Sequence, residues 1–480
     1  MSASLLWYDI ETFGRHPQWD RIAQFAAIRT NDSFEWIEEP IVLHCKVTPD
    51  YLPDPEACVI TGITPDTVAE DGMTEREIAA EINKIMVVPG TCSVGYNNIR
   101  FDDEFVRALF YRNFYDPYRR EYESANSRWD IIDLARMCRD LRPDGVNWIE
   151  DEDGKPSFKL SELTRANGIE HENAHDALAD VKATIGLGAL LRERQPRLFS
   201  YYFGLRKKEE VRKRLNLQRA QPLLHTSAKY SSNLGCTTLV LPLSVHPTQA
   251  NVVIAYDLRR DPSDWMNEPV DEIRRRVFSK REELEEGERI PLKGIHLNRS
   301  PAIAPSSTID DERANTLGIN LDVCRNNAKI LLEAPDILQN VRRAFAERPR
   351  RSYFDPELQI YSGDFFPDED REVFGRIRSS TPDELRADPP ILYDRRGGEL
   401  LWRYVARNFT ESLDEKEHER WRSFCATRIL TPEPDYVIDF GRFQREVANR
   451  LQRVDTPAED KLVLKRLADY GDHLERTILS

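Results

Sequence analysis

The sequence predicts an α/β protein of about three domains, in which a mixed sheet comes first and a helical domain last. The chain has 480 residues, of which 40% are hydrophobic and 31% charged, a composition typical of folded globular proteins. In the first third, apolar strands come first and then alternate with segments of helical periodicity, which favours a mixed α/β sheet. Helical periodicity dominates the last 130 residues, and the region between has the strands of a small barrel or sheet.

Two changes in composition mark the expected domain boundaries. Residues 197–219 contain eight Lys or Arg and two Glu, whereas the whole chain has a net charge of −15. This basic segment is either a solvated helix between domains or a surface that faces nucleic acid. Residues 349–356 are rich in proline and charge, which is typical of a boundary. We therefore expect domains at residues 1–195, 196–350 and 351–480.

The apolar pattern predicts the elements of the first domain in order. Three strands at residues 4–10, 23–30 and 41–47 come in close succession, which suggests an antiparallel meander. A helix is expected at residues 75–87, where apolar side chains recur at helical spacing, and a strand at residues 91–96. Further helices are expected at residues 103–113, 131–138, 160–167 and 175–192.

The second domain is expected to combine strands with helices, and the third to be helical. The strands expected in the second domain are at residues 236–243, 251–258 and 294–303, and its helices include residues 270–279 and 320–333. The helices expected in the third domain are at residues 368–379, 401–408, 415–430, 439–454 and 458–478.

Composition excludes several classes of protein. No run of about 18 apolar residues is present to span a membrane, and the N-terminus lacks the pattern of a signal peptide. The seven cysteines are scattered without a C-x-x-C pair, so neither a disulfide framework nor a zinc site is expected. These features predict a cytoplasmic protein with no membrane partner. The acidic total argues against a protein that coats nucleic acid, but permits an enzyme with a basic groove or metal-binding carboxylates.

Five residues stand out as candidates for chemistry. Asp9 and Glu11 lie near the end of the first strand, where residues i and i+2 point to the same face. Asp102 opens a helix after a later strand, and His175 and Asp180 lie at the start of another helix. Taken singly, Asp102 also fits a helix cap, and His175 fits a surface or capping residue.

The motifs D-x-E, N-x-x-F-D and H-x-x-x-x-D occur in this order within 180 residues. Together they resemble the histidine-bearing subgroup of the DEDD exonuclease superfamily, which has a ribonuclease H-like fold. Phosphodiester hydrolysis with two Mg²⁺ ions, for which Mn²⁺ can substitute, needs oxygen ligands and a base. The expected metal ligands are Asp9, Glu11, Asp102 and Asp180. Histidine is suited to proton transfer near neutral pH, so His175 is the expected general base, with Asp103 and Asp176 outside the ligand set.

Longer stretches narrow the resemblance to the bacterial exodeoxyribonuclease I family. They include YDIETFG at residues 8–14, RIAQFAAIRT at residues 21–30, GYNNIRFDDE at residues 95–104 and ANGIEHENAHD at residues 166–176, and shorter matches reach residue 409. The resemblance implies a processive enzyme that releases 5′-mononucleotides from the 3′ end of single-stranded DNA, with a role in DNA repair and recombination. It also implies an exonuclease domain, a middle domain with a small SH3-like β-barrel and a helical C-terminal domain.

Local composition also indicates a channel for a single strand. Nine of the 29 residues from 101 to 129 are aromatic, and arginines are interleaved with them. Bases stack on aromatic faces and Arg binds phosphate, although most of these aromatics also fit a core. The expected contacts with single-stranded DNA are Arg107, Tyr118, Tyr122 and Arg136. By resemblance, Glu11, Phe158 and Lys159 contact the terminal nucleotide, although the family more often has Arg in place of Lys159.

The resemblance further implies a monomer that binds the acidic C-terminal tail of the single-stranded-DNA-binding protein. The candidate residues for this peptide are Arg142 and the basic cluster at residues 206–214. Two other functions stay open: an enzyme of the same fold that acts on RNA ends, and a non-catalytic nucleic-acid clamp. The three-domain length favours DNA over RNA, and the presence of all five candidate residues argues against the clamp.

Overall fold

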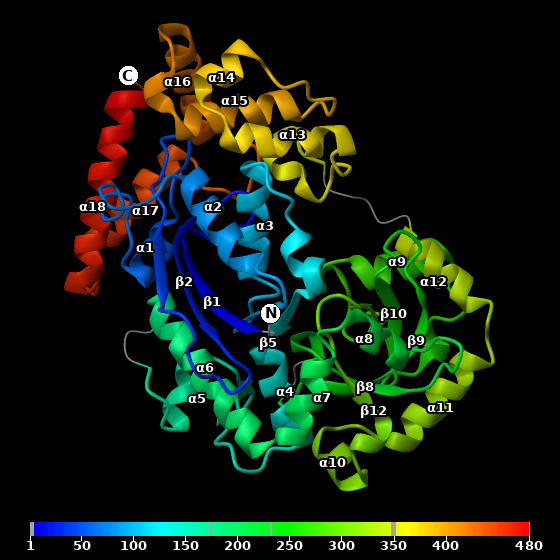
Figure 1. Ribbon diagram of the computed structural model, residues 1–480. Coiled ribbons are helices and arrows are strands. Elements are labelled where there is room, and N and C mark those ends of the chain that lie inside the picture. Colours follow the sequence, from blue (N-terminus) through cyan, green and yellow to red (C-terminus); the bar gives the residue numbers. More distant parts are fainter. Residues whose placement is uncertain (1–3, 172–174, 231–232, 347–351, 480) are drawn as a thin grey trace.

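The computed structural model describes residues 4–171, 175–230, 233–346 and 352–479. A mixed sheet lies at the centre of the molecule, with a second sheet on one side and the C-terminal helices wrapped around the other (Figure 1). None of the helices in these ranges is long and apolar enough to cross a membrane.

The first sheet has the strand order β3-β2-β1-β4-β5. Its strands are β1 (Ser4–Thr12), β2 (Ile22–Thr30), β3 (Ile41–His44), β4 (Thr91–Gly95) and β5 (Ser127–Asp130). The expected meander is confirmed, because β2 pairs antiparallel with both β1 and β3, whereas β4 runs parallel to β1 and β5. β1 and β2 are buried along nearly their whole length, so apolar residues fill them almost continuously.

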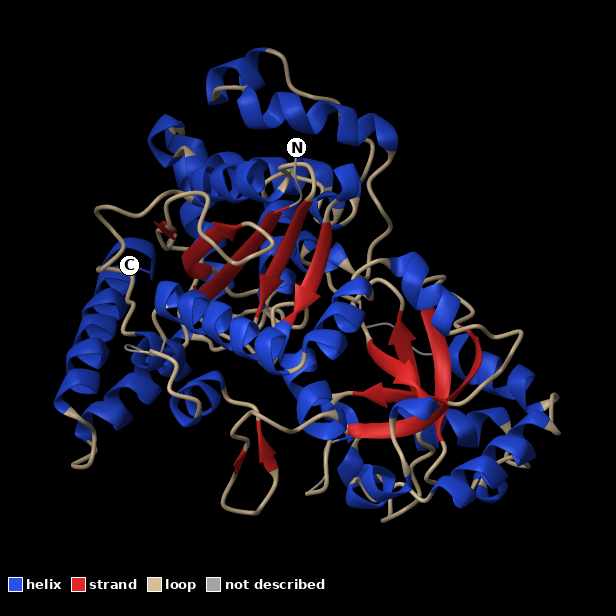
Figure 2. Ribbon diagram, turned by 60° about the horizontal axis from the view of Figure 1, so that its bottom comes forward, coloured by secondary structure: helices blue, strands red, loops and turns tan. Residues whose placement is uncertain are grey.

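Helices cover both faces of this sheet (Figure 2). Apolar residues of α2 and α3 share one core cluster with β1 and β2, and α4 and α6 contribute to the cluster on the other face. The helices of this region are α1 (Pro55–Thr61), α2 (Glu75–Met86), α3 (Asp102–Arg112), α4 (Ile131–Leu141), α5 (Leu160–Ala166) and α6 (Ala177–Arg194), and a small hairpin pairs β6 (Ile149–Glu150) with β7 (Pro156–Ser157).

The second sheet has the order β11-β10-β9-β8-β12. The single strand expected at residues 294–303 is wrong, because a turn with Ser300 at φ 45° separates β11 from β12. These two edge strands do not pair in the described part of the chain, so the small barrel is not closed. The strands are β8 (Leu223–Thr226), β9 (Thr237–Val245), β10 (Val252–Asp257), β11 (Leu292–His296) and β12 (Ala302–Pro305), and the helices are α9 (Val270–Phe278), α10 (Asp311–Thr316), α11 (Leu321–Leu332) and α12 (Ile337–Ala346).

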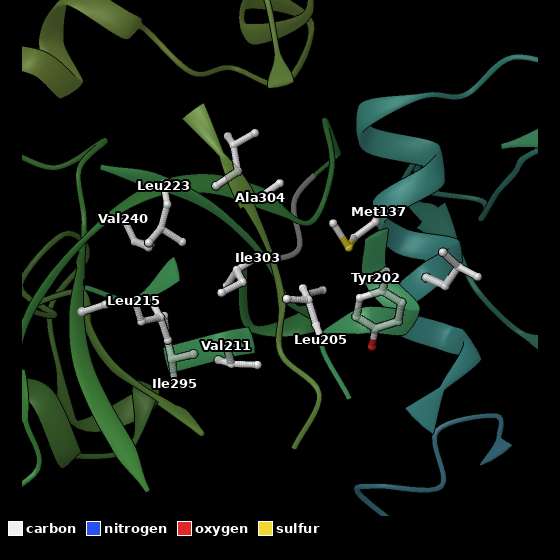
Figure 3. Packing of buried hydrophobic residues seen from close by; sticks show 14 of the residues in the cluster. Met137, Tyr202, Leu205, Val211, Leu215, Leu223, Val240, Ile295, Ile303 and Ala304 are labelled. Atoms are coloured by element: carbon white, nitrogen blue, oxygen red, sulfur yellow. The ribbon is translucent and has the colours of Figure 1, made fainter. Parts of the chain in front are cut away.

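A continuous hydrophobic core joins the two sheets. The connecting helices α7 (Pro196–Gly204) and α8 (Lys208–Arg214) contribute buried apolar side chains to it. Figure 3 shows Leu205 between Ile303 of the second sheet and Tyr202, with Tyr202 and Met137 of α4 on the side of the first sheet. Close-packed apolar side chains leave little freedom for relative movement, so this core fixes the second sheet beside the first.

The C-terminal region is helical, as expected. Some of its apolar residues pack on the N-terminal region, where Phe443 and Leu467 share a core cluster with Phe13 and Tyr51. Its helices are α13 (Asp368–Ser379), α14 (Pro382–Ala387), α15 (Gly397–Asn408), α16 (Glu415–Leu430), α17 (Phe440–Gln452) and α18 (Ala458–Leu474).

Candidate active site

The end of β1 presents two carboxylates to the same face of the first sheet. Asp9 lies opposite Ala26 and Glu11 opposite Gln24 on β2, and the pairing shifts register directly after Glu11. Alternate residues of a strand share a face, so the side chains of Asp9 and Glu11 leave the sheet on the same side. The register shift ends the regular pairing where a cleft can open beside the strand.

The start of α3 brings a third carboxylate to β1. The backbone N–H of Ile10 donates to Asp102 Oδ1 at 3.1 Å, which fixes this side chain beside the strand. The neighbouring Asp103 is buried and accepts from the Tyr8 hydroxyl and from Arg120, each at 2.6 Å. Although burial opposes ionisation, Arg120 holds the pKa of Asp103 below its usual range. Asp103 thus ties α3 to β1, and its charge is already neutralised.

The helix expected from residue 175 begins two residues later, at Ala177. Asp176 is its N-cap and accepts from the backbone N–H of Ala179 at 3.0 Å. His175 therefore precedes the helix, with φ at 74°, a left-handed conformation that His adopts more readily than most residues. The expectation that His175 is part of the helix is wrong, because capping by Asp176 sets the boundary.

Three of the five candidate residues meet within a small space. Potential ligand atoms of Glu11, His175 and Asp180 all lie within 4.8 Å of one another. Glu11 is buried, Asp180 is half-buried and His175 is exposed, so the group opens towards solvent. Asp9 and Asp102 lie outside this 4.8 Å group but interact with it electrostatically.

Two of the three residues expected at the terminal nucleotide, Phe158 and Lys159, lie directly before α5. The Phe158 carbonyl accepts from the Tyr96 hydroxyl at 2.6 Å, and the Arg136 guanidinium lies 5.6 Å from the centre of the Phe158 ring. Lys159 is exposed and pairs with Glu162 at 3.1 Å. Phe158 is therefore held from two sides, whereas Lys159 can reorient towards a phosphate.

The four expected contacts with single-stranded DNA differ in exposure. Arg107 is 3% exposed and pairs with Glu121 at 2.7 Å, with the Tyr118 ring 5.1 Å from its guanidinium. Arg136 is also buried and pairs with Asp133 at 2.8 Å. The charges of both arginines are thus already neutralised. Of the four, only Tyr122 is strongly exposed, at 66%.

The residues expected to bind the acidic peptide lie on the surface beside the second sheet. Arg142 ends α4 and donates to the Thr308 carbonyl at 3.0 Å. In the basic cluster of residues 206–214, Arg206 stacks on Phe203, and the glutamates of α8 pair with its last three basic residues. Arg142 has no such acidic partner among the described residues.

Two residues that hold this site were not predicted. Gln24 accepts from the backbone N–H of Ala177 at 3.0 Å, which ties the start of α6 to β2. His171 lies with its Nε2 2.5 Å from Asp180 Oδ1. Both lie in the stretches that resemble the family, and Gln24 is a polar residue in an otherwise apolar strand segment.

Comparison with known proteins covers nearly the whole chain. Residues 6–187 match the family described as Exonuclease, residues 206–347 the Exonuclease I SH3-like domain, and residues 354–474 the Exonuclease I C-terminal domain. Exodeoxyribonuclease I of Escherichia coli (strain K12) is 43% identical over 477 residues, which are 98% of each chain. The chain belongs to the exodeoxyribonuclease I family. It is therefore a nuclease, and membership of this family implies dependence on a divalent metal.

Other members of the exodeoxyribonuclease I family agree in sequence and fold. The Haemophilus influenzae enzyme is 44% identical over 467 residues, 97% of each chain. The structure of E. coli Exonuclease I with a dA16 oligonucleotide matches with a TM-score of 0.92 and 41% identity, over 98% of this chain and 100% of that one. The structure of Exonuclease I from Methylocaldum szegediense matches with a TM-score of 0.93 and 43% identity, over 98% of this chain and 99% of that one. A further E. coli structure is a zinc-bound complex of the enzyme with single-stranded DNA. Another solved structure is of SSB/Exonuclease I in complex with an inhibitor.

The electrostatics of the carboxylates fit a metal site. Burial, together with repulsion from Asp180 and Asp102, raises the pKa of Glu11 to about 8. Burial, followed by repulsion from Asp102, Asp180 and Glu11, likewise raises the pKa of Asp9. Burial is also the main reason why the pKa of Asp102 is raised. Grouped carboxylates without a compensating positive charge are the donor set that hard divalent cations require.

We expect Glu11→Gln to stabilise the metal-free protein at alkaline pH. The pKa of Glu11 is about 8 when folded, against an ordinary 4.5, so the folded state holds this proton more tightly than the unfolded state. The wild-type protein therefore loses stability as the pH rises from 4.5 to 8, and glutamine avoids this loss. Chemical unfolding in EDTA at pH 9 should show a gain of about 5 kcal/mol, and almost none near pH 4.5.

The matched control for this measurement is Glu70→Gln, because Glu70 is exposed and far in sequence from the cluster. This control should unfold like the wild-type protein at both pH values. A Glu11→Gln protein less stable than the wild type at pH 9 would show that the carboxylates do not repel one another.

Proposed function

We propose that this protein degrades single-stranded DNA processively from its 3′ end with two Mg²⁺ ions and releases 5′-mononucleotides. The observation that carries the proposal is the meeting of Glu11, His175 and Asp180 within 4.8 Å, beside two further carboxylates. The proposal includes the domains at residues 1–195, 196–350 and 351–480, a monomer, a cytoplasmic location and a role in DNA repair and recombination. The seven cysteines are buried and the sequence has no C-x-x-C pair, which suits a reducing compartment.

The proposal gives each candidate residue a role. Asp9, Glu11, Asp102 and Asp180 would hold the metal ions. Mg²⁺ or Mn²⁺ bound there would neutralise the charge that develops on the scissile phosphate. His175 is exposed beside Glu11 and Asp180, so it can take the proton from the attacking water. Phe158 and Lys159 would hold the terminal nucleotide, the first by stacking and the second as a point charge on phosphate.

A cleft on the second sheet offers a path for the rest of the strand. Its volume is about 1160 Å³, and it lies between β10 and β11 on one side and residues 353–362 on the other. Lys293 Nζ lies 4.4 Å from the centre of the Tyr230 ring, and Tyr361 lines the opposite wall. Basic groups that follow phosphates and aromatic rings that stack on bases are the two components of single-strand binding.

The substrate is tested with 5′-labelled DNA and RNA single strands and a DNA duplex of the same sequence. The proposal predicts Mg²⁺-dependent shortening of the DNA single strand in preference to the other two, and no shortening by Asp180→Ala. Preferential degradation of RNA would instead identify an RNA exonuclease. Binding of DNA without any shortening would identify a clamp.

For the partner, we infer that Arg142 receives the acidic C-terminal tail of the single-stranded-DNA-binding protein. Arg142→Glu should weaken binding of the tail peptide about tenfold in fluorescence anisotropy, because a hydrogen bond to a charged group contributes 1.5–3 kcal/mol. Arg442→Glu on α17 is the control and should bind like the wild-type protein. Unchanged affinity after charge reversal at Arg142 and at the cluster of residues 206–214 would reject this surface.

A further inference from the structure

His171 makes the shortest side-chain contact to a proposed metal ligand in the described residues. Its Nε2 lies 2.5 Å from Asp180 Oδ1, and its side chain is only 5% exposed. An ionised carboxylate has no proton to donate, so with Asp180 ionised the Nε2–H of His171 is the donor. The contact is therefore a hydrogen bond from the imidazole to one particular carboxylate oxygen.

The other side of the imidazole ring is held by α5. His171 Nδ1 lies 3.1 Å from Thr164 Oγ1, and that hydroxyl lies 2.8 Å from the Leu160 carbonyl. Both ring nitrogens thus have a partner, which fixes the plane of the ring. A chain of polar contacts runs from the backbone of α5 through Thr164 and His171 to Asp180.

We propose that His171 is a positioning residue that sets the orientation of the Asp180 carboxylate for metal binding. Asp180 lies in the first turn of α6, and its side chain is 18% exposed, so packing alone leaves the carboxylate free to rotate. The hydrogen bond to Oδ1 restricts rotation of the carboxylate and leaves Oδ2 available to a metal ion. Hydrogen-bond partners of metal ligands commonly tune metal affinity in this way. This inference rests on the proposed metal-binding role of Asp180.

The local fold has supports other than this hydrogen bond. The N-terminus of α6 is capped by Asp176, and the core that α5 and α6 share is apolar, with Leu163 and Val181 buried in it. Loss of the imidazole should therefore change metal binding without unfolding the protein. This separation makes the role of His171 testable.

The experiment measures Mn²⁺ binding to the full-length protein by calorimetry at pH 8, without DNA. His171→Phe keeps a ring but lacks the donor, and should weaken Mn²⁺ binding about 10–100-fold. His171→Gln keeps an N–H donor and should restore most of the affinity. The midpoint of thermal unfolding in EDTA should be the same for the wild-type protein, His171→Phe and His171→Gln. His418→Phe, on the exposed face of α16, should bind Mn²⁺ like the wild type.

Each outcome decides one question. Wild-type Mn²⁺ affinity in His171→Phe, or equal losses in His171→Phe and His171→Gln, would overturn the positioning role. Asp180→Asn separates this failure from failure of the proposed function, because unchanged binding in that variant would remove Asp180 from the metal site itself. If His171→Phe does not fold, the Thr164→Val variant is measured in its place. The positioning role then requires Thr164→Val to bind Mn²⁺ more weakly than His171→Gln does.

Discussion

Replacement of His175 by asparagine should slow hydrolysis of single-stranded DNA by about 10²–10⁴-fold, the usual contribution of a general base. Asparagine is the suitable replacement because it tolerates the left-handed backbone at this position, where φ is 74°. It cannot take a proton from water, so the chemical step loses its base while the fold is kept. Single-turnover shortening of a 5′-labelled strand at saturating Mg²⁺ measures the effect.

The same variant separates a base from a metal ligand. His175 lies within 4.8 Å of Glu11 and Asp180, so its imidazole could also bind the ion. For a general base, we expect nearly unchanged Mn²⁺ affinity in His175→Asn, together with slow hydrolysis of single-stranded DNA. His418→Asn on α16 is the control and should hydrolyse DNA at the wild-type rate. A parallel fall in Mn²⁺ affinity and in the rate of hydrolysis would show that His175 is a metal ligand. An unchanged rate would show that His175 takes no part in the reaction.

Glu357→Gln should destabilise the protein by about 3–5 kcal/mol, the usual cost of leaving buried charges unpaired. Glu357 is 1% exposed and accepts from Arg407 at 2.8 Å and Arg428 at 2.9 Å, with Arg21 of the N-terminal region at 3.3 Å. Arg407 also donates to the buried Asp50 at 2.7 Å. The network joins the C-terminal helices to the N-terminal region, so its loss should also loosen their packing.

The pH dependence of this network has a defined sign. Against the effect of burial, Arg407, Arg428 and Arg403 hold the pKa of Glu357 well below its usual range. The stabilisation is therefore complete above the ordinary glutamate pKa and is lost as the pH falls. Chemical unfolding at neutral pH should show the full deficit of Glu357→Gln, and the deficit should shrink on acidification. Glu369→Gln on the surface of α13 should have little effect, and an equally small effect of Glu357→Gln would contradict the account.

Much of the sheet that carries the site was predictable from sequence. The apolar runs of β1, β2 and β4 stand out, and Asp9 and Glu11 share a face because strand side chains alternate. β5 was not predicted, because its segment SRWD is short and half charged. Arg128 and Asp130 are nevertheless buried there, since Arg128 pairs with Asp103 at 2.7 Å and Asp130 accepts from the Asn97 N–H at 2.8 Å. Long-range pairing of charges does not appear in a local apolar pattern.

The parts of the site that could not be predicted depend on capping and on distant contacts. The helical pattern of residues 175–192 continues through Asp176, and only its cap to Ala179 shows that His175 lies outside the helix. His171, which precedes α6 in the chain, contacts Asp180 in the first turn of that helix, and periodicity says nothing about such a contact. The closure of a barrel likewise depends on pairing between β11 and β12, which are separated by a turn.

An anomalous difference map from crystals grown with Mn²⁺ and a single-stranded oligonucleotide tests most directly whether the four acids bind two metal ions at the 3′ end of the strand. We expect two manganese peaks about 3.5–4 Å apart, in contact with carboxylate oxygens of the four acids at the end of β1 and the starts of α3 and α6. The phosphate that joins the last two nucleotides of the 3′ end should lie against the peaks, with His175 beside it. Manganese bound elsewhere, or a 3′ end that lies away from His175, would contradict the account.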